Sequence, residues 1–312
     1  MCLTHNFWGF FVPGLANGFL YALIALGYTL VYGVLQLINF AHSEVFMSGG
    51  FAGLFTLNWL IGKSHPAGMS SVGYVVIGCV AGAVGGGVVA YLLERVAYRP
   101  LRRRRAPKLA FLISAIGASY FLLNLAGKEF GRDSRPIAQP FTQTQTDPLF
   151  TIFGTGVSLY YAVIALVAII MLVMLDRLVN KTRLGQGIRA VAQDADTAGL
   201  MGVDINRVIA QTFIVGGLLG GAAGFLYGLG PANVSYTMGF TPGLKAFTAA
   251  VLGGIGNIRG AMLGGLLLGI IENLSVACIS PSWVDVVSFF ILVLVLLVRP
   301  TGILGERLGR SA

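Results

Sequence analysis

The chain contains 312 residues, of which 56% are hydrophobic and only 11% are charged, with 21 Lys and Arg against 12 Asp and Glu. A soluble globular domain carries about 25% charged residues, so this composition excludes an ordinary soluble enzyme and a disordered chain. The mean hydropathy of +0.81 instead indicates a polytopic membrane protein.

Nine apolar segments are candidate membrane spans, because a helix needs about 20 mostly apolar residues to cross the hydrocarbon core. Their apolar runs are continuous, which favours helices over an outer-membrane barrel. Pro242, Lys245 and three glycines interrupt the seventh segment, so it either spans or is re-entrant near 240–257. We predict an all-α, polytopic helical bundle of eight or nine spans, forming a single transmembrane domain over 1–312. The segments are 8–35, 45–61, 72–93, 109–126, 152–175, 208–229, 240–255, 261–278 and 284–298.

A polar patch lies between the first two predicted spans, where Asn39, His42 and Glu44 are close together in sequence. An ionised carboxylate at mid-bilayer costs about 2.5–3.5 kcal/mol, so Glu44 is expected either at a water surface or inside a hydrated pathway. Two interpretations stay open. The patch is a short cytoplasmic turn, or it is a broken helix whose freed backbone groups line a substrate route.

Basic residues gather in alternate connections between the predicted spans. Seven fall within 94–108, five within 176–207, and three close the chain. The positive-inside rule places such connections in the cytoplasm, which explains the net charge without nucleic acid. The connection 128–150 balances its charges and is expected outside. Nine spans put the N-terminus outside and the C-terminus inside, whereas eight spans move one end to the other side.

The two inner connections differ in character. The consecutive arginines at 102–105 make 94–108 strongly cationic, which suits a layer of anionic lipid headgroups. The region 185–207 instead mixes charges of both signs with small residues at helical spacing, which predicts a short amphipathic helix docking into a partner's groove. An ordinary solvated loop is the alternative. In the docking interpretation Ala195, Ala198, Gly199 and Gly202 form the inserted ridge, with Arg189 and Asp194 at its rim.

Glycine recurs every four residues in two late spans. Such rows let helix backbones approach closely in lipid, so they indicate tight helix packing. A subunit interface along one row is the second interpretation, and the sequence does not separate the two. The rows are Gly216, Gly220 and Gly224, and Gly256, Gly260 and Gly264.

No motif for catalysis or for binding metals or nucleotides is visible. Gly62, Lys63 and Ser64 resemble the end of a phosphate loop, but Leu57 stands where the leading glycine is required. The three cysteines and three histidines lack metal-ligand spacing. We therefore expect no catalytic residue, no metal and no cofactor.

Three segments resemble, in order, the signatures of permeases of branched-chain amino acid ABC importers. They are 17–51, which contains the polar patch, then 189–228 and 243–273. Ser43 is a departure, since this family usually has glycine after the histidine.

The resemblance implies a second homologous permease subunit, two ATP-binding subunits and a periplasmic solute-binding protein as partners. It also implies a small amino acid substrate, typically leucine, isoleucine or valine, carried across the bacterial inner membrane into the cytoplasm. The alternative function is a gradient-driven secondary transporter or channel for a small polar solute such as urea or an amide. Such a transporter needs ion-binding carboxylates near the midplane, and only Glu44 and Glu272 are candidates.

Overall fold

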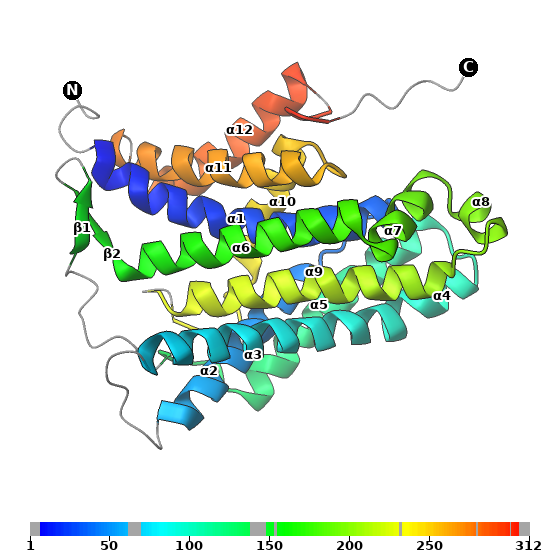
Figure 1. The fold of residues 1–312 in the computed structure, drawn as a ribbon, viewed down its shortest axis with the longest axis horizontal. Helices are drawn as coiled ribbons and strands as arrows, with labels where there is room; N and C mark the ends of the chain where they lie inside the picture. Colours follow the sequence, from blue (N-terminus) through cyan, green and yellow to red (C-terminus); the bar gives the residue numbers. More distant parts are fainter. Residues whose placement is uncertain are drawn as a thin grey trace. The chain divides into compact units, whose positions relative to one another are not determined.

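The computed structural model describes residues 7–61, 70–137, 148–152, 155–230, 233–278, 280–299 and 301–305. It is 82% helical, which confirms the predicted all-α membrane bundle. One antiparallel hairpin, β1 (Pro148–Ile152) with β2 (Thr155–Ser158), is the exception in these ranges. The helices, shown in Figure 1, are α1 (Phe7–Leu35), α2 (His42–Ile61), α3 (Ser70–Leu93), the π-helix η1 (Glu94–Tyr98), α4 (Arg99–Arg103), α5 (Lys108–Glu129), α6 (Leu159–Lys181), α7 (Arg183–Gln193), α8 (Ala195–Leu200), α9 (Ile205–Gly228), α10 (Phe240–Gly253), α11 (Ile258–Cys278), the 3-10 helix η2 (Pro281–Trp283) and α12 (Val284–Val298).

Eight helical segments of the described chain are long and apolar enough to cross a membrane. The ninth candidate contains α10, whose 14 residues cover only about 21 Å at 1.5 Å per residue. This is less than the hydrocarbon thickness of about 30 Å, so α10 alone does not span. Eight of the nine predicted segments are therefore helices of spanning length, whereas the seventh is too short to cross as a helix alone.

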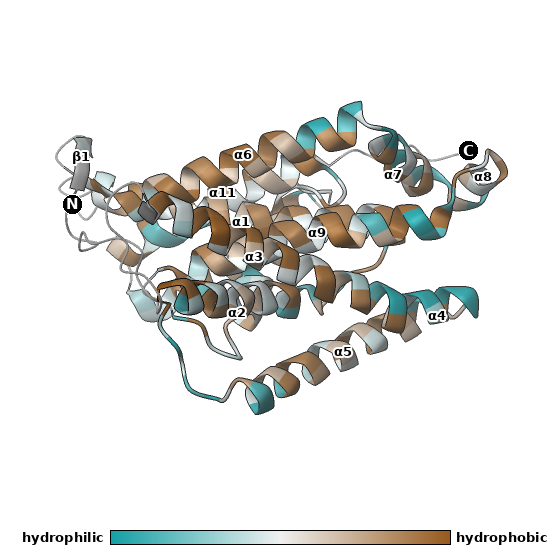
Figure 2. Cartoon of the chain, turned by 60° about the horizontal axis from the view of Figure 1, so that its bottom comes forward, coloured by the Kyte–Doolittle hydropathy of each residue, from teal (hydrophilic) through white to brown (hydrophobic). Residues whose placement is uncertain are grey.

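The two inner connections are more helical than expected. The third span runs through η1 and α4 to Arg103, so most of 94–108 continues a helix. Within 176–207, α6 extends to Lys181, and α7 and α8 follow as separate helices. In Figure 2, α4 is mostly hydrophilic, and α6 changes from hydrophobic to hydrophilic toward α7. Residues 62–64, and residues 138–147 of the predicted outer connection, lie outside the described residues.

The chain divides into two compact units, and three of the four divisions fall inside α1, α6 and α10. The first unit comprises Met1–Thr29, Gln145–Leu172 and Lys245–Ala312, and the second comprises Leu30–Thr144 and Val173–Leu244.

The second unit is built around the contact of α2, α3 and α9. Glycines occupy this contact at positions where a larger side chain would collide with the neighbouring helix. A Cβ added at Gly224 would lie 2.0 Å from the Phe46 carbonyl oxygen of α2, and one at Gly221 would lie 2.2 Å from the Gly82 carbonyl oxygen of α3. Gly220 faces the His42 ring, and Gly216 is buried. The row thus lies inside this unit, where close backbone approach supplies van der Waals contact.

The second glycine row packs α11 within the first unit. A Cβ at Gly264 would lie 2.1 Å from the Ala249 carbonyl oxygen of α10, and one at Gly260 would lie 2.4 Å from the Gly253 carbonyl oxygen. Gly256 does not belong to this row. It lies in the turn before α11 with a φ of +97° and open space around its Cβ position. Its glycine suits a left-handed turn, so its assignment to helix packing was wrong.

The end of α10 is joined to the segment that follows α12. The backbone N–H of Ile303 donates to the Leu252 carbonyl at 2.9 Å, and that of Leu304 donates to the Gly253 carbonyl at 3.0 Å. The Asn257 side chain also donates to the Leu304 carbonyl at 2.9 Å. These bonds put the last turn of α10 and the segment after α12 at one membrane depth.

Candidate functional site

The polar patch before α2 is a buried break in the helical structure. Gln36, with a φ of +53°, follows the last residue of α1, and α2 begins only at His42. Asn39 Oδ1 accepts a hydrogen bond from the Ala41 backbone N–H at 3.1 Å and another from the Tyr98 hydroxyl at 2.7 Å. The amide therefore fixes the entry into α2 and ties it to η1.

Glu44 lies one turn further on, in the first turn of α2. Its side chain is buried, as are those of Asn39 and His42. Oε1 accepts hydrogen bonds from Ser119 of α5 at 3.1 Å and from Ser43 at 3.3 Å. Oε2 is buried and has no hydrogen-bond partner among the described residues. The three side chains of the patch are therefore covered by the protein, and the patch contains a buried carboxylate with one free acceptor oxygen.

A second buried polar cluster lies in the first unit and joins α10, α11 and α12. Lys245 Nζ lies 3.1 Å from Glu272 Oε1 and 2.8 Å from Asp285 Oδ1. The Tyr21 hydroxyl of α1 donates to Glu272 Oε2 at 2.9 Å, and the Ser288 hydroxyl donates to Oε1. The cluster satisfies both oxygens of a carboxylate inside an apolar region, and it anchors the short helix α10.

Sequence reasoning treated Lys245 only as an interruption of a span. A usable signal was present, because Lys245, Glu272 and Asp285 are charged residues in three consecutive apolar segments. Ionisable residues in such segments commonly pair with one another.

A third polar cluster connects η1 and α4 with the beginning of α9. Both segments lie in connections that the sequence predicts to be cytoplasmic. Arg102 Nη2 lies 2.8 Å from Glu94 Oε1 and donates to Asn206 Oδ1 at 2.8 Å. Arg102 therefore differs from the neighbouring arginines, although the sequence grouped 102–105 as one cationic run. Its pairing holds η1 against the beginning of α9.

The predicted docking region contains two capped helices. Asp194 ends α7 and caps α8, accepting hydrogen bonds from the backbone N–H groups of Asp196 at 3.0 Å and Thr197 at 3.1 Å. These bonds and one from the Thr197 hydroxyl lower the pKa of Asp194, so the cap persists at neutral pH. After α8, Gly202 adopts a φ of +89°, and the Val203 N–H donates to the Ala198 carbonyl at 3.0 Å. This is a glycine-terminated C-cap.

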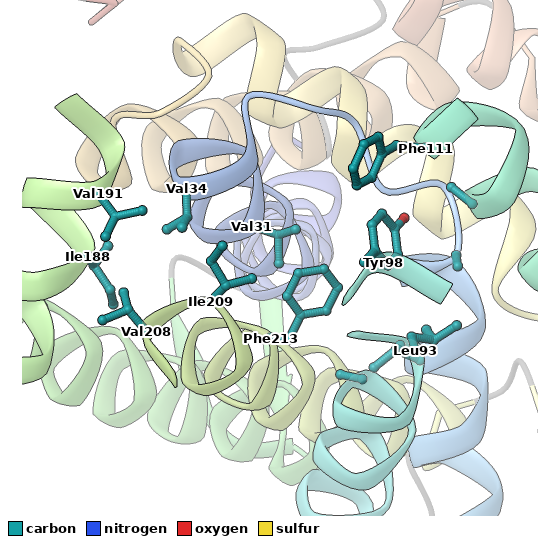
Figure 3. Close-up of a cluster of buried hydrophobic side chains, with 14 of the residues drawn as sticks. Val31, Val34, Leu93, Tyr98, Phe111, Ile188, Val191, Val208, Ile209 and Phe213 are labelled. Carbon is teal, nitrogen blue, oxygen red and sulfur yellow. The ribbon is translucent and has the colours of Figure 1, made fainter. Parts of the chain in front are cut away.

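The small side chains of α8 face their own chain. Ala198 is buried and belongs to a hydrophobic cluster with Ile188 and Val191 of α7 and Val208 and Ile209 of α9, most of which Figure 3 displays. Ala195 packs at the edge of the same cluster. The predicted insertion of the Ala198 side chain into a partner therefore needs correction, because burial in this cluster leaves it no free surface. Gly199 and Gly202 are exposed.

The exposed tip of the region between α6 and α9 consists of Leu200, the last residue of α8, and Met201, which follows it. This tip is apolar. Leu200 is 89% exposed and Met201 is 82% exposed. Arg189 is exposed on α7, and its guanidinium donates to the Val179 carbonyl at the end of α6. An open groove of about 600 Å³ borders α7 and α9 and is lined by Arg183, Leu184, Gln186, Gly187, Ala190, Val203, Val208 and Gln211. The region thus combines a rigid, capped base with an exposed apolar tip.

Comparison with known proteins decides the family. Residues 10–296 match the family described as "Branched-chain amino acid transport system / permease component". The chain belongs to this permease family. It is 43% identical over 297 residues to the high-affinity branched-chain amino acid transport system permease protein LivH of Escherichia coli, covering 94% of each chain.

Further relatives support this membership. The permease protein BraD of Pseudomonas aeruginosa is 42% identical over 302 residues, covering 95% of this chain and 94% of the relative. A more distant relative, the probable permease protein LivM of Methanocaldococcus jannaschii, is 25% identical over 91% of this permease and 84% of its own length. No solved structure matches. The resemblance inferred from three sequence segments is therefore confirmed over nearly the whole chain.

Proposed function

We propose that this chain is the membrane-spanning permease subunit of an ABC importer that carries leucine, isoleucine or valine into the cytoplasm. The observation that carries the proposal is the 43% identity to LivH of Escherichia coli over 94% of both chains. The protein is a multi-pass protein of the bacterial inner membrane and acts as a transport subunit instead of an enzyme.

Energy for import comes from separate chains in this proposal. The complex contains a second homologous permease, two ATP-binding subunits and a periplasmic solute-binding protein. The existence of a LivM-type relative 25% identical to this chain supports pairing of two related permeases. The absence of a complete phosphate-loop motif from the sequence is compatible with ATP hydrolysis on a partner.

Within the permease, Asn39, His42 and Glu44 border the route of the substrate. Their burial beside a non-helical break supports this role, because irregular backbone at membrane depth is tolerated where it lines a cavity or is covered by protein. The ammonium and carboxylate of a zwitterionic substrate need polar partners along the route. Glu44 Oε2 and the backbone of the break supply such groups.

Coupling to the ATPase uses the region between α6 and α9, which we propose lies in the cytoplasm together with 94–108. Arg189 and Asp194 lie at the base, Ala195 and Ala198 support α8 from inside, and Gly199 and Gly202 leave room around the tip. The exposed apolar pair Leu200 and Met201 enters the partner's groove. Burial of these two apolar side chains in a partner's groove is favourable through the hydrophobic effect.

The experiment replaces LivH of Escherichia coli by this chain and measures uptake of radiolabelled leucine at submicromolar concentration. Restored uptake that requires the ATP-binding subunits is the expected result, and a strain with an empty vector is the control. Uptake that persists without those subunits would contradict the proposal in favour of a gradient-driven transporter. Uptake of urea or an amide but not of leucine would overturn the substrate assignment.

A further inference from the structure

A hollow lined by arginines lies where the third membrane span ends. It has a volume of about 270 Å³, and its lining consists of Arg95, Arg99, Pro100, Arg103 and Arg104. Arg95 comes from the π-helix η1, Arg99 and Arg103 lie on α4, and Arg104 caps α4. The four-residue spacing of 95, 99 and 103 is that of neighbouring side chains on one side of a helix, and all three arginines line the hollow.

The positive charge of this hollow is not neutralised within the described part of the chain. None of the ion pairs found there involves the four lining arginines. The adjacent carboxylate, Glu94, is fully buried and pairs with Arg102, which does not line the hollow. Four neighbouring guanidinium groups without a carboxylate repel one another, so an anionic ligand would relieve a cost that the chain itself leaves uncompensated.

Arg99 provides a second indication of a missing ligand. Its Nε is buried and has no hydrogen-bond partner among the described residues. A buried N–H without an acceptor costs more free energy than a solvated one. A ligand with phosphate oxygens supplies acceptors in the fork geometry that guanidinium groups prefer. The π-turn beside it is a rare element that frequently occurs at functional sites.

The surface leading to the hollow is apolar. Val84, Val88, Leu92 and Val96 are exposed at four-residue intervals along α3 and η1, and Val96 is 72% exposed. The row ends beside Arg95. A soluble anion gains nothing from such a row, whereas an acyl chain buries it. The pattern of an apolar strip that ends in a cationic hollow therefore matches an amphiphile with an anionic head.

We propose that Arg95, Arg99, Arg103 and Arg104 form a site for the headgroup of an anionic phospholipid, whose acyl chain lies along the exposed row of α3. The site is more specific than general attraction of a basic segment to a lipid surface, because it is a defined hollow with an unsatisfied donor. It is independent of the solute that the permease carries.

The experiment measures lipid binding to the full-length protein in detergent by native mass spectrometry. Phosphatidylglycerol is compared with phosphatidylcholine of the same chain length, and inorganic phosphate is added as a competitor. The test variant is Arg99→Gln with Arg103→Gln. The matched control is Arg105→Gln with Lys108→Gln, which removes the same charge from exposed residues that do not line the hollow.

We expect at least tenfold tighter binding of phosphatidylglycerol than of phosphatidylcholine. Each basic residue near an anionic lipid surface contributes about fivefold, so the test variant should bind about 25-fold more weakly and the control within threefold of wild type. Equal binding of both lipids, an equal loss in the control, or displacement of the lipid by equimolar inorganic phosphate would each overturn the proposal.

A single variant, Arg103→Gln, keeps the test decisive if the double variant does not fold. The Arg103 side chain is exposed, so its replacement does not disturb the core. It should weaken phosphatidylglycerol binding about fivefold, and unchanged binding would count against the site.

Discussion

At the scale of single residues, the permease contains two carboxylates whose surroundings differ. Both oxygens of Glu272 accept hydrogen bonds, and a lysine lies 3.1 Å from one of them. Glu44 receives two serine hydroxyls on Oε1 and none on the buried Oε2 within the described residues. A fully partnered group is suited to holding helices together. A partly free acceptor is suited to meeting a ligand.

Glu44→Gln should lower substrate uptake at least tenfold. The amide retains an oxygen for the two serines, but it removes the negative charge and one free acceptor, which leaves a substrate ammonium group without its partner. Uptake is measured in the complete transport complex, and co-purification of the partners monitors assembly. Glu129→Gln, an exposed carboxylate at the end of α5, is the control. Normal uptake by Glu44→Gln would return the patch to a structural role.

Lys245→Met should destabilise the protein by about 3–5 kcal/mol, the typical cost of removing one partner of a buried ion pair. Glu272 would remain buried without its cation. Thermal unfolding in detergent measures the effect, and the double variant Lys245→Met with Glu272→Gln should recover most of the loss. Asp285→Asn should cost less than about 1 kcal/mol, because the Asp285 side chain is 59% exposed. A mild effect of Lys245→Met would show that the pair is dispensable.

At the scale of elements, α8 has a buried inner face and an exposed tip. Ala198 packs into the cluster beneath it, whereas Leu200 and Met201 extend away from the chain. A bulky residue at 198 would disrupt packing within the permease itself, so it cannot distinguish docking from folding. The exposed tip offers the cleaner test.

Leu200→Glu should abolish most substrate-stimulated ATP hydrolysis in the assembled complex while leaving the permease inserted and folded. A charge in place of an apolar anchor carries a desolvation penalty when the partner's groove closes over it. Gln193→Glu places the same charge at an exposed site at the end of α7 and should leave stimulation within about twofold. Stimulated hydrolysis at the native rate in Leu200→Glu would place docking elsewhere.

At the scale of the whole molecule, the sides of the membrane on which the two chain ends lie depend on whether the stretch that contains α10 crosses it. The bonds of Ile303 and Leu304 put the end of α10 at the depth of the segment after α12. At the other end of this stretch, Val234 pairs with Arg135, in the connection expected outside. The non-helical residues before α10 and α10 itself together complete a crossing if the basic C-terminus lies in the cytoplasm.

Cysteine labelling of intact cells tests this topology. In a background without native cysteines, position 140 should react with a membrane-impermeant reagent, while 103, 190 and 257 should react only after permeabilisation. The reason is the positive-inside distribution of the basic connections combined with the bonds that join 252–257 to 303–304. Labelling of 257 from outside would show that α10 returns to the side from which it entered.

The helical class, the eight strong spans and the family could be predicted from the sequence. Hydropathy over about 20 residues is a property of a continuous segment, and the family signatures 17–51, 189–228 and 243–273 are likewise local. A local signal also located the polar patch. None of these inferences required knowledge of which segments touch.

Only the tertiary structure decided which polar groups are partnered and which faces are free. Lys245 meets Glu272, 27 positions away, and Asn39 meets Tyr98, 59 positions away. The burial of Ala198 depends on its contact with residues of α9. Arg102 donates to Asn206 of α9, whereas the neighbouring Arg103 lines the hollow. The physical reason is that hydropathy is a sum over neighbours in the chain, whereas the cost of a buried charge or donor depends on distant groups that the fold brings within about 3 Å.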